Sequence, residues 1–398
     1  MSWAGPHQYT IGKTRHQSKK LRTVERTPSL DENAPTLLCL SHLRWRFVYQ
    51  RPQHLMSRFA RTHRVLFFEE PIESDQPSPW LEVSEEEDGV TVLVPRLPAH
   101  CKGEAVEQAQ RTLLDEYLEG VPKERLVVWY YTPMSLNFAD HLTPRLTVYD
   151  CMDELSAFEG APPELLERER RLMQKADVIF TGGVSLFEAK RTLHNNVHPF
   201  PSSVDINHFA KARDPLPEPE DQASIPYPRL GFYGVIDERL DLELLAEMAR
   251  QRPDWHFVLV GPIVKIDPAS LPQRSNLHYL GGKAYDELPD YLAGWDVALM
   301  PFALNESTRF ISPTKTPEYL AGGRPVVSTP VTDVVRTYGH TDLVRIAATP
   351  AEFIAAIEAA FDDLQDRERV LSSADQILKD MSWDITWKLM EEQMKCAQ

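Results

Sequence analysis

The sequence lacks the features of a membrane-spanning, secreted or nucleic-acid-binding protein. Its longest apolar runs, such as 257–260 and 297–302, have the length of strands and are much shorter than a membrane-spanning helix. The chain does not open with a charged and then apolar leader, so we expect that it is not secreted. Basic residues number 43 against 59 acidic residues, and the resulting net charge of −16 argues against general binding of nucleic acid.

Cysteine is scarce as well, and its placement does not suggest a metal site. The four cysteines are scattered without the paired spacing of zinc ligands, at Cys39, Cys101, Cys151 and Cys396. So few unpaired cysteines are typical of a reducing compartment, and a cytoplasmic protein is therefore expected.

The basic residues that are present gather in two places. Residues 13–26 carry six lysines and arginines against one glutamate. Arg51, Arg58, Arg61 and Arg64 follow at a spacing that predicts one helix. Either cluster could contact an anionic lipid surface, which would place the protein at the inner face of a membrane. The alternative is a solvated tail and an ordinary helix face.

The pattern of apolar residues predicts an α/β protein, and 398 residues are enough for two domains. Short apolar runs predict strands at 36–40, 63–68, 125–131, 146–149, 229–236, 255–261 and 297–302. The polar residues 1–34 have the composition of a flexible leader, and residues 210–226 are rich in proline and acid, as a linker would be. Domains are therefore expected at 35–209 and 227–381.

The segment 312–329 begins with a helix start that could bind an anion. Ser312 before Pro313, or Thr316 before Pro317, would place a hydroxyl at the N-cap and a proline at the first helical position. Thr314 and Lys315 lie between these two possible starts. Free N–H groups beside a lysine suit the oxygens of a phosphate group.

An acidic residue lies one turn inside this predicted helix. The Glu318 carboxylate can accept hydrogen bonds from a pair of ribose hydroxyls while the neighbouring amides hold phosphate. Taken alone, the same segment also fits an ordinary helix in an α/β protein. Its interpretation as a nucleotide site therefore depends on the rest of the chain.

Polar side chains at two strand ends are the candidates for catalysis. Asp150 and Asp153 follow the strand at 146–149, where carboxylates can act as bases or bind sugar hydroxyls. Asp153 could instead cap the next helix. Arg51 follows the loop after the first strand and is a plausible contact to a phosphate, although it could also pack or cap.

Four phrases, in this order along the chain, resemble GT-B glycosyltransferases, in particular the large retaining group known as group 1 or family 4. They are SHLRW-x-FVYQRPQHL at 41–55, YD-C-x-D-x-x-SAF at 149–158, P-x-x-VD-x-x-x-F at 201–209, and SP-x-K-x-x-EYLA-x-G-x-PVV at 312–327. The resemblance implies two doubly wound, Rossmann-like domains that face each other across a cleft. It also implies that a closing helix within 382–398 crosses back to the first domain.

The resemblance further implies the transfer of a sugar from a nucleotide diphosphate sugar, of which a UDP-sugar is the expected one. The acceptor would be a hydroxyl of a glycan, a lipid-linked molecule or a small molecule, and the transfer would retain the anomeric configuration. The donor would be a substrate, with no cofactor and no metal ion. The residues implied in donor binding are Gly234, Arg239, Gly282, Lys283, Arg309, Ser312, Thr314, Lys315 and Glu318.

The sequence departs from the family pattern in the donor half. Val235 stands where an arginine usually grips the diphosphate, and Phe310 stands where a second glutamate usually precedes Glu318. If Asp150 or Asp153 acts as a general base on the opposite face of the sugar, the transfer would invert the anomeric configuration instead. A GT-B-shaped sugar-nucleotide epimerase and a non-catalytic nucleotide-sugar-binding protein are the alternatives from other classes.

Overall fold

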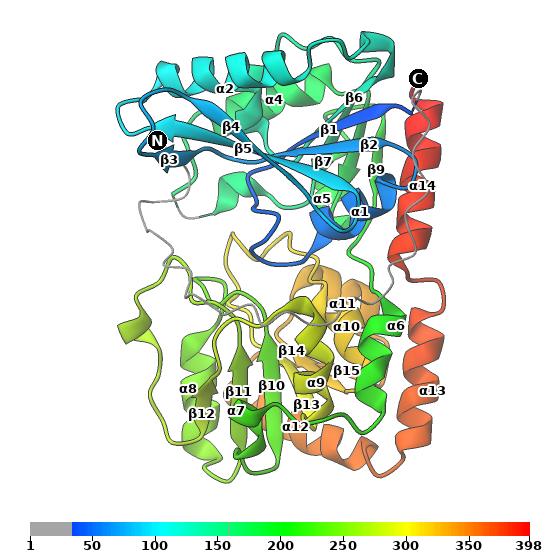
Figure 1. Ribbon diagram of the computed structural model, residues 1–398. Helices are drawn as coiled ribbons and strands as arrows, with labels where there is room; N and C mark the ends of the chain where they lie inside the picture. The colour runs from blue at the N-terminus through cyan, green and yellow to red at the C-terminus, as the bar shows by residue number, and fades with distance from the viewer. Residues whose placement is uncertain (1–33, 159) are drawn as a thin grey trace.

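The computed structural model describes residues 34–158 and 160–398, which form two lobes, each built around a mainly parallel sheet (Figure 1). The first sheet has nine strands, in the order β3-β5-β2-β1-β6-β7-β8-β9, and β4 pairs antiparallel with β5. These strands are β1 (Thr36–Leu40), β2 (Arg64–Phe68), β3 (Ile72–Ser74), β4 (Trp80–Glu85), β5 (Val90–Pro98), β6 (Leu126–Tyr130), β7 (Leu146–Cys151), β8 (Val178–Thr181) and β9 (Val197–Pro199).

The second sheet has six strands, in the order β12-β11-β10-β13-β14-β15, and every neighbouring pair is parallel. They are β10 (Arg229–Tyr233), β11 (His256–Val260), β12 (Leu277–Tyr279), β13 (Val297–Met300), β14 (Val326–Ser328) and β15 (Val344–Ile346). The loops that follow the strands of both sheets are directed toward the junction of the lobes (Figure 1). Such strand-end loops line the binding site of an open α/β sheet.

Helices cover both faces of the first sheet. They are α1 (Arg51–Phe59), α2 (Glu104–Tyr117), α3 (Leu136–Ala139), α4 (Leu165–Lys175) and α5 (Val184–Lys190). Within β1, Leu37 and Cys39 belong to the core cluster that includes α1, whereas Leu38 and Leu40 belong to the cluster that includes α2 and α4. Both faces are therefore buried, which explains why the strand is apolar throughout rather than alternating with polar residues.

The segment before the second sheet packs on the second lobe. Val204, Phe209, Ala212 and Ile225 all belong to the core cluster of that lobe. The segment therefore contributes to the second core along much of its length, including the residues expected to form a linker. The helices from this point are α6 (Ile206–Phe209), α7 (Glu220–Ala223), α8 (Leu242–Gln251), α9 (Leu288–Ala293), α10 (Lys315–Ala321), α11 (Thr332–Tyr338), α12 (Pro350–Asp363) and α13 (Arg367–Leu378).

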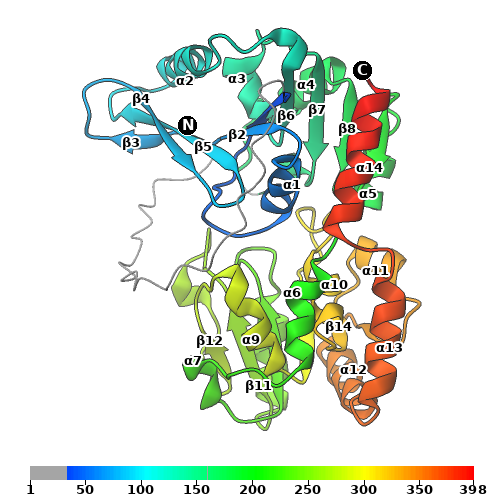
Figure 2. The same ribbon diagram turned by 45° about the vertical axis from the view of Figure 1, so that its right-hand side comes forward.

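The last helix, α14 (Trp383–Cys396), returns to the first lobe, as expected. Figure 2 shows α13 beside the second lobe and α14, in red, beside the first. Trp383, Trp387 and Met390 lie in the same core cluster as α1, and the Trp383 ring stacks on His54 at a centroid distance of 4.7 Å. The buried face predicted for this helix is confirmed.

The start of α10 differs from both predicted starts. The helix begins at Lys315, and Thr314 occupies the N-cap without a hydrogen bond from its side chain. Pro317 is thus the third helical residue rather than the first. A proline is tolerated there because the N–H groups of the first turn have no partner within the helix.

Of the two basic clusters, only the second lies within the described residues. Residues 13–26 lie outside the described residues. Arg64 belongs to β2 rather than to the predicted helix, while Arg58 and Arg61 both pair with Asp384 of α14, at 3.0 and 2.7 Å. These arginines therefore hold α14 against α1. In the part of the chain that the structure describes, no helix has the length and apolar character needed to cross a membrane.

Polar contacts join the lobes at α5 and α11. Asp333, in the first turn of α11, accepts a hydrogen bond of 3.0 Å from the backbone N–H of Ser185 in α5. Arg336 of α11 pairs with Glu188 of α5 at 2.8 Å. The start of a first-lobe helix is therefore capped by a side chain of the second lobe.

Candidate active site between the lobes

The predicted donor side of the site is built on the loop after β10. Gly234 has a φ of +148°, and a Cβ atom placed on it would lie 2.3 Å from Cε of Lys315. A Cβ atom on Gly261, after the neighbouring β11, would lie 1.7 Å from the carbonyl oxygen of Gly234. Glycine is required at both positions, because only its bare backbone lets these loops and the Lys315 side chain approach so closely.

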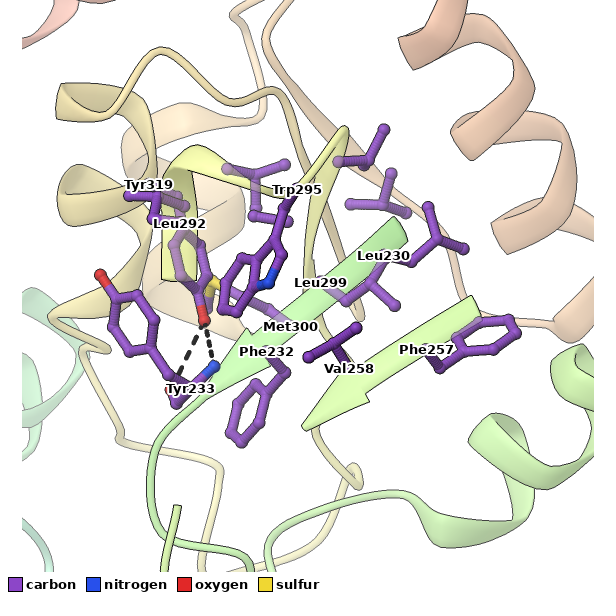
Figure 3. Packing of buried hydrophobic residues seen from close by; sticks show 14 of the residues in the cluster. Leu230, Phe232, Tyr233, Phe257, Val258, Leu292, Trp295, Leu299, Met300 and Tyr319 are labelled. Atoms are coloured by element: carbon purple, nitrogen blue, oxygen red, sulfur yellow. Dashed lines mark hydrogen bonds between the residues drawn. The ribbon is translucent and has the colours of Figure 1, made fainter. Parts of the chain in front are cut away.

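Helix α10 is fastened to the same strand end. The hydroxyl of Tyr319 accepts a hydrogen bond of 3.0 Å from the backbone N–H of Tyr233, the last residue of β10, and donates to the carbonyl of the same residue at 3.4 Å (Figure 3). Trp295 lies close to both tyrosine rings within the core. The first turn of α10 is therefore held at a fixed position beside Gly234.

Glu318 is buried beside Lys315. Only 6% of the residue is exposed, and this burial raises the pKa of Glu318 to about 7, although the nearby Lys315 and Tyr233 oppose the rise. Burial also lowers the pKa of Lys315, and Glu318 opposes that shift. Hydrogen bonds donated by a ligand would stabilise the charged form of a carboxyl group in such surroundings.

The first lobe contributes Asp153, which follows β7. Burial raises the pKa of Asp153 to about 6, whereas the positive charges of Arg239, Arg51 and Lys315 act against the increase. Arg239 belongs to the loop after β10, and Asp237 holds its guanidinium at 2.7 Å. The structure thus brings Asp153, Arg239, Lys315 and Glu318 into one charged neighbourhood between the lobes.

Asp150 and Arg51 are paired with each other. They form an ion pair of 2.9 Å in which neither side chain is more than 3% exposed. Arg51 also donates to the carbonyl oxygen of Phe200 at 2.7 Å. In this structure both residues hold the strand ends of the first lobe together, and neither presents a charged atom to a substrate.

Three other predicted donor residues are exposed or paired with other side chains. The ammonium of Lys283 pairs with Asp221 at 2.5 Å, and Gly282 is exposed. Arg309 is 62% exposed and lies 3.5 Å from Glu306. Ser312 does lie between the lobes, because its Cβ would be 3.0 Å from a Cβ placed on Gly183 of the first lobe.

One cation near the site was not predicted from the sequence. Lys265 follows β11, and its ammonium lies 5.3 Å from the centre of the Phe158 ring, which belongs to the first lobe. Arg239 contacts the same ring at 5.6 Å. A single lysine in the loop after β11 has no distinctive signal in the sequence, because only the fold brings it to Phe158.

The raised pKa of Glu318 predicts how stability depends on pH. The folded protein retains a proton on Glu318 that the unfolded chain loses near pH 4.5, so this group destabilises the fold as pH rises from about 4.5 to 7. The Glu318→Gln variant does not titrate. Its stability relative to the natural protein should therefore increase by about 2–3 kcal/mol across that window. Urea unfolding at several pH values measures this, and parallel curves would contradict the assigned pKa.

The comparison with protein families identifies the second lobe. Residues 228–363 match the family described as glycosyl transferases group 1. This part of the chain is a group 1 glycosyl transferase domain. The predicted family and enzyme class are therefore confirmed, as is the fold of two Rossmann-like lobes.

One relative of this chain is a Bacillus subtilis (strain 168) protein named as a teichuronic acid biosynthesis glycosyltransferase, TuaH. The two sequences are 29% identical over 265 residues, which cover 62% of this chain and 66% of the relative, slightly less than two thirds of its length.

Solved GT-B structures match along almost the whole chain. Sucrose-phosphate synthase from Thermosynechococcus elongatus has a TM-score of 0.68 at 16% identity, covering 92% of this chain and 100% of its own. HepE of Anabaena, in complex with UDP, has a TM-score of 0.64 at 13% identity, covering 91% and 100%. An Escherichia coli trehalose-6-phosphate structure bound with UDP-2-fluoro glucose has a TM-score of 0.64 at 12% identity, covering 90% of this chain and 99% of its own.

Proposed function

We propose that this glycosyltransferase transfers a sugar from a UDP-sugar to an acceptor hydroxyl in the synthesis of a bacterial polysaccharide or glycolipid. The observation that carries the proposal is the position of Lys315 against the bare backbone of Gly234, with Glu318 one turn further along α10. The ammonium can bind the diphosphate and the carboxylate can bind the ribose. The choice of UDP is supported by the ligands named for two similar structures, and the choice of polysaccharide by the name of TuaH.

The main chemical task of such a site is to stabilise the departing nucleotide diphosphate. Arg239 lies in the loop after β10, Lys315 is the first residue of α10, and both lie near Asp153. Fixed positive charges of this kind stabilise charge that develops on the leaving group as the glycosidic bond breaks. We propose that they do so without a metal ion. Across residues 34–158 and 160–398, no cluster of three or more histidine, cysteine or acidic side chains is arranged to hold one.

We propose that the anomeric configuration is retained, as the family resemblance implies. The leaving phosphate would then take the proton of the acceptor hydroxyl on the same face of the sugar. Asp153 would orient the reacting sugar or acceptor, because a carboxylate near Arg239 can accept hydrogen bonds from hydroxyls. Asp150 and Arg51 would act indirectly, by holding the loop that carries Asp153.

The test is a turnover assay with UDP-, GDP- and dTDP-sugars and a panel of glycan and lipid-linked acceptors. We expect activity with a UDP-sugar, unchanged activity after addition of EDTA, and a product with the donor's anomeric configuration by NMR. An inverted product would refute the retaining mechanism. Nucleotide binding without turnover on any acceptor would favour a non-catalytic binder, and conversion of the donor sugar itself would favour an epimerase.

Peripheral contact with an anionic membrane is a separate proposal. After the pairing of Arg58 and Arg61 with Asp384, its remaining support is the basic composition of residues 13–26. The full chain should sediment with vesicles of anionic phospholipid and not with neutral vesicles. A variant with glutamine at the six basic positions of 13–26 should lose this binding, and equal binding by both proteins would exclude that segment as the contact.

A further inference from the structure

A carboxylate without hydrogen-bond partners lies beside the proposed donor site. Glu238 separates Asp237 from Arg239 in the loop after β10, and its side chain is 17% exposed. Both carboxylate oxygens are buried, and no group among the described residues donates a hydrogen bond to either. The ammonium of Lys265 is 3.9 Å away, which is beyond hydrogen-bond distance. A buried carboxylate in this state is costly unless a ligand supplies the donors.

Lys265 itself has an unusual backbone. Among the non-glycine residues in the described part of the chain, it alone has a positive φ, of 64°. This conformation is uncommon for a residue with a side chain, and such strain is often found where a side chain must be aimed at a ligand. Here it accompanies an ammonium that lies over the Phe158 ring.

Phe158 completes the arrangement from the opposite lobe. It lies five residues after Asp153 in the loop that follows β7, and its ring contacts both Lys265 and Arg239. Lys265 thus lies near both Glu238 and Phe158, and Arg239 contacts the same ring. Lys265 follows β11, which lies on the opposite side of β10 from β13, the strand before α10 with its Lys315 and Glu318.

Together, a carboxylate, an ammonium and an aromatic ring can bind the hydroxyls, the negative charge and the apolar face of one saccharide. We propose that Glu238, Lys265 and Phe158 form an acceptor subsite for an anionic saccharide. Glu238 accepts hydrogen bonds from its hydroxyls, Lys265 pairs with its phosphate or carboxylate, and Phe158 provides an apolar wall. This subsite rests on the proposed function, since it gives the acceptor a place beside the donor. The same cation could in principle serve the donor diphosphate, so the test separates the two sources of negative charge.

The first arm of the test measures binding to the natural protein by thermal shift and calorimetry. The probes are UDP, glucose 6-phosphate, glucuronate and neutral glucose. In the presence of UDP, we expect glucose 6-phosphate or glucuronate to raise the unfolding temperature in a saturable way, while glucose does not. If neither anionic saccharide binds, or if glucose binds equally well, the proposal is wrong.

The second arm uses variants. Lys265→Gln should weaken binding of the anionic saccharide about tenfold or more, the effect of losing one charge-assisted hydrogen bond, and leave the affinity for UDP unchanged. Lys379→Gln, at the exposed C-cap residue of α13, is the matched control and should change neither affinity. A loss of UDP affinity in Lys265→Gln, with saccharide binding intact, would assign this lysine to the donor and overturn the acceptor subsite.

Glu238→Gln distinguishes the role of the carboxylate. It keeps the size of the side chain but removes its charge, so it should reduce saccharide binding while the protein remains folded; unchanged saccharide binding would remove Glu238 from the subsite. The outcomes also separate this proposal from the proposed function. If UDP fails to bind the natural protein but an anionic saccharide binds through Lys265, the donor assignment fails and the subsite remains.

Discussion

Replacing Glu318 with alanine is expected to weaken the binding of UDP by about 1–3 kcal/mol, or roughly 5- to 150-fold. The variant would remove the acceptor for the ribose hydroxyls and leave Lys315 without the opposing charge that now lies beside it. Isothermal titration calorimetry with UDP measures the effect directly. The pKa of Glu318 in the natural protein is about 7, so the carboxyl group loses its proton as pH rises through neutrality. The affinity of the natural protein for UDP should therefore also increase over this pH range.

The matched control for this experiment is Glu306→Ala. Glu306 lies twelve residues earlier, its side chain is 77% exposed, and its only described ion pair is with the exposed Arg309. Removing an exposed pair of this kind changes little. Equal UDP affinity in Glu318→Ala and the natural protein would remove Glu318 from the nucleotide site, and with it the main support for the proposed donor position.

Trp383→Ala is expected to destabilise the protein by about 3–5 kcal/mol, the usual cost of removing a large aromatic side chain from a core. Trp383 is fully buried at the start of α14, where its ring stacks on His54 of α1. The substitution would leave a cavity where the closing helix meets the first lobe. Chemical denaturation followed by far-UV circular dichroism would show the loss as a lower midpoint.

Trp80→Ala provides the comparison for this prediction. Trp80 begins β4 at the edge of the first lobe and is 42% exposed. Its removal should therefore lower the free energy of unfolding much less than the removal of Trp383 does. Similar losses in the two variants would mean that α14 contributes no more to the first lobe than a surface strand does.

The local pattern around 312–327 predicted the donor side of the fold because its signals are short-range. A proline-rich helix start, a glutamate one turn inside and a pair of terminal glycines describe a single turn–helix–strand unit. The exact start was wrong, since a proline is acceptable anywhere in the first turn and does not mark its first residue. The buried face of α14 was predictable for a similar reason, because its spacing alone defines one side of a helix.

Pairings between distant residues could not be predicted in this way. Arg51 and Asp150 are 99 positions apart, and only the parallel alignment of β1, β6 and β7 brings them together. Each therefore resembled a free catalytic group in the sequence. Lys265 is the opposite case, since nothing in the sequence distinguishes it from other lysines. Only the structure shows its positive φ and its contact with the Phe158 ring of the other lobe.

The hydrogen bond from Ser185 to Asp333 makes one backbone amide sensitive to the relative movement of the lobes. Any swing that draws α11 away from α5 breaks this bond, parts Arg336 from Glu188, and leaves the Ser185 amide open to solvent. Deuterium uptake at the Ser185 amide would then report how often the two lobes separate. A bound nucleotide that clamps the lobes should slow that uptake, even though it touches neither helix.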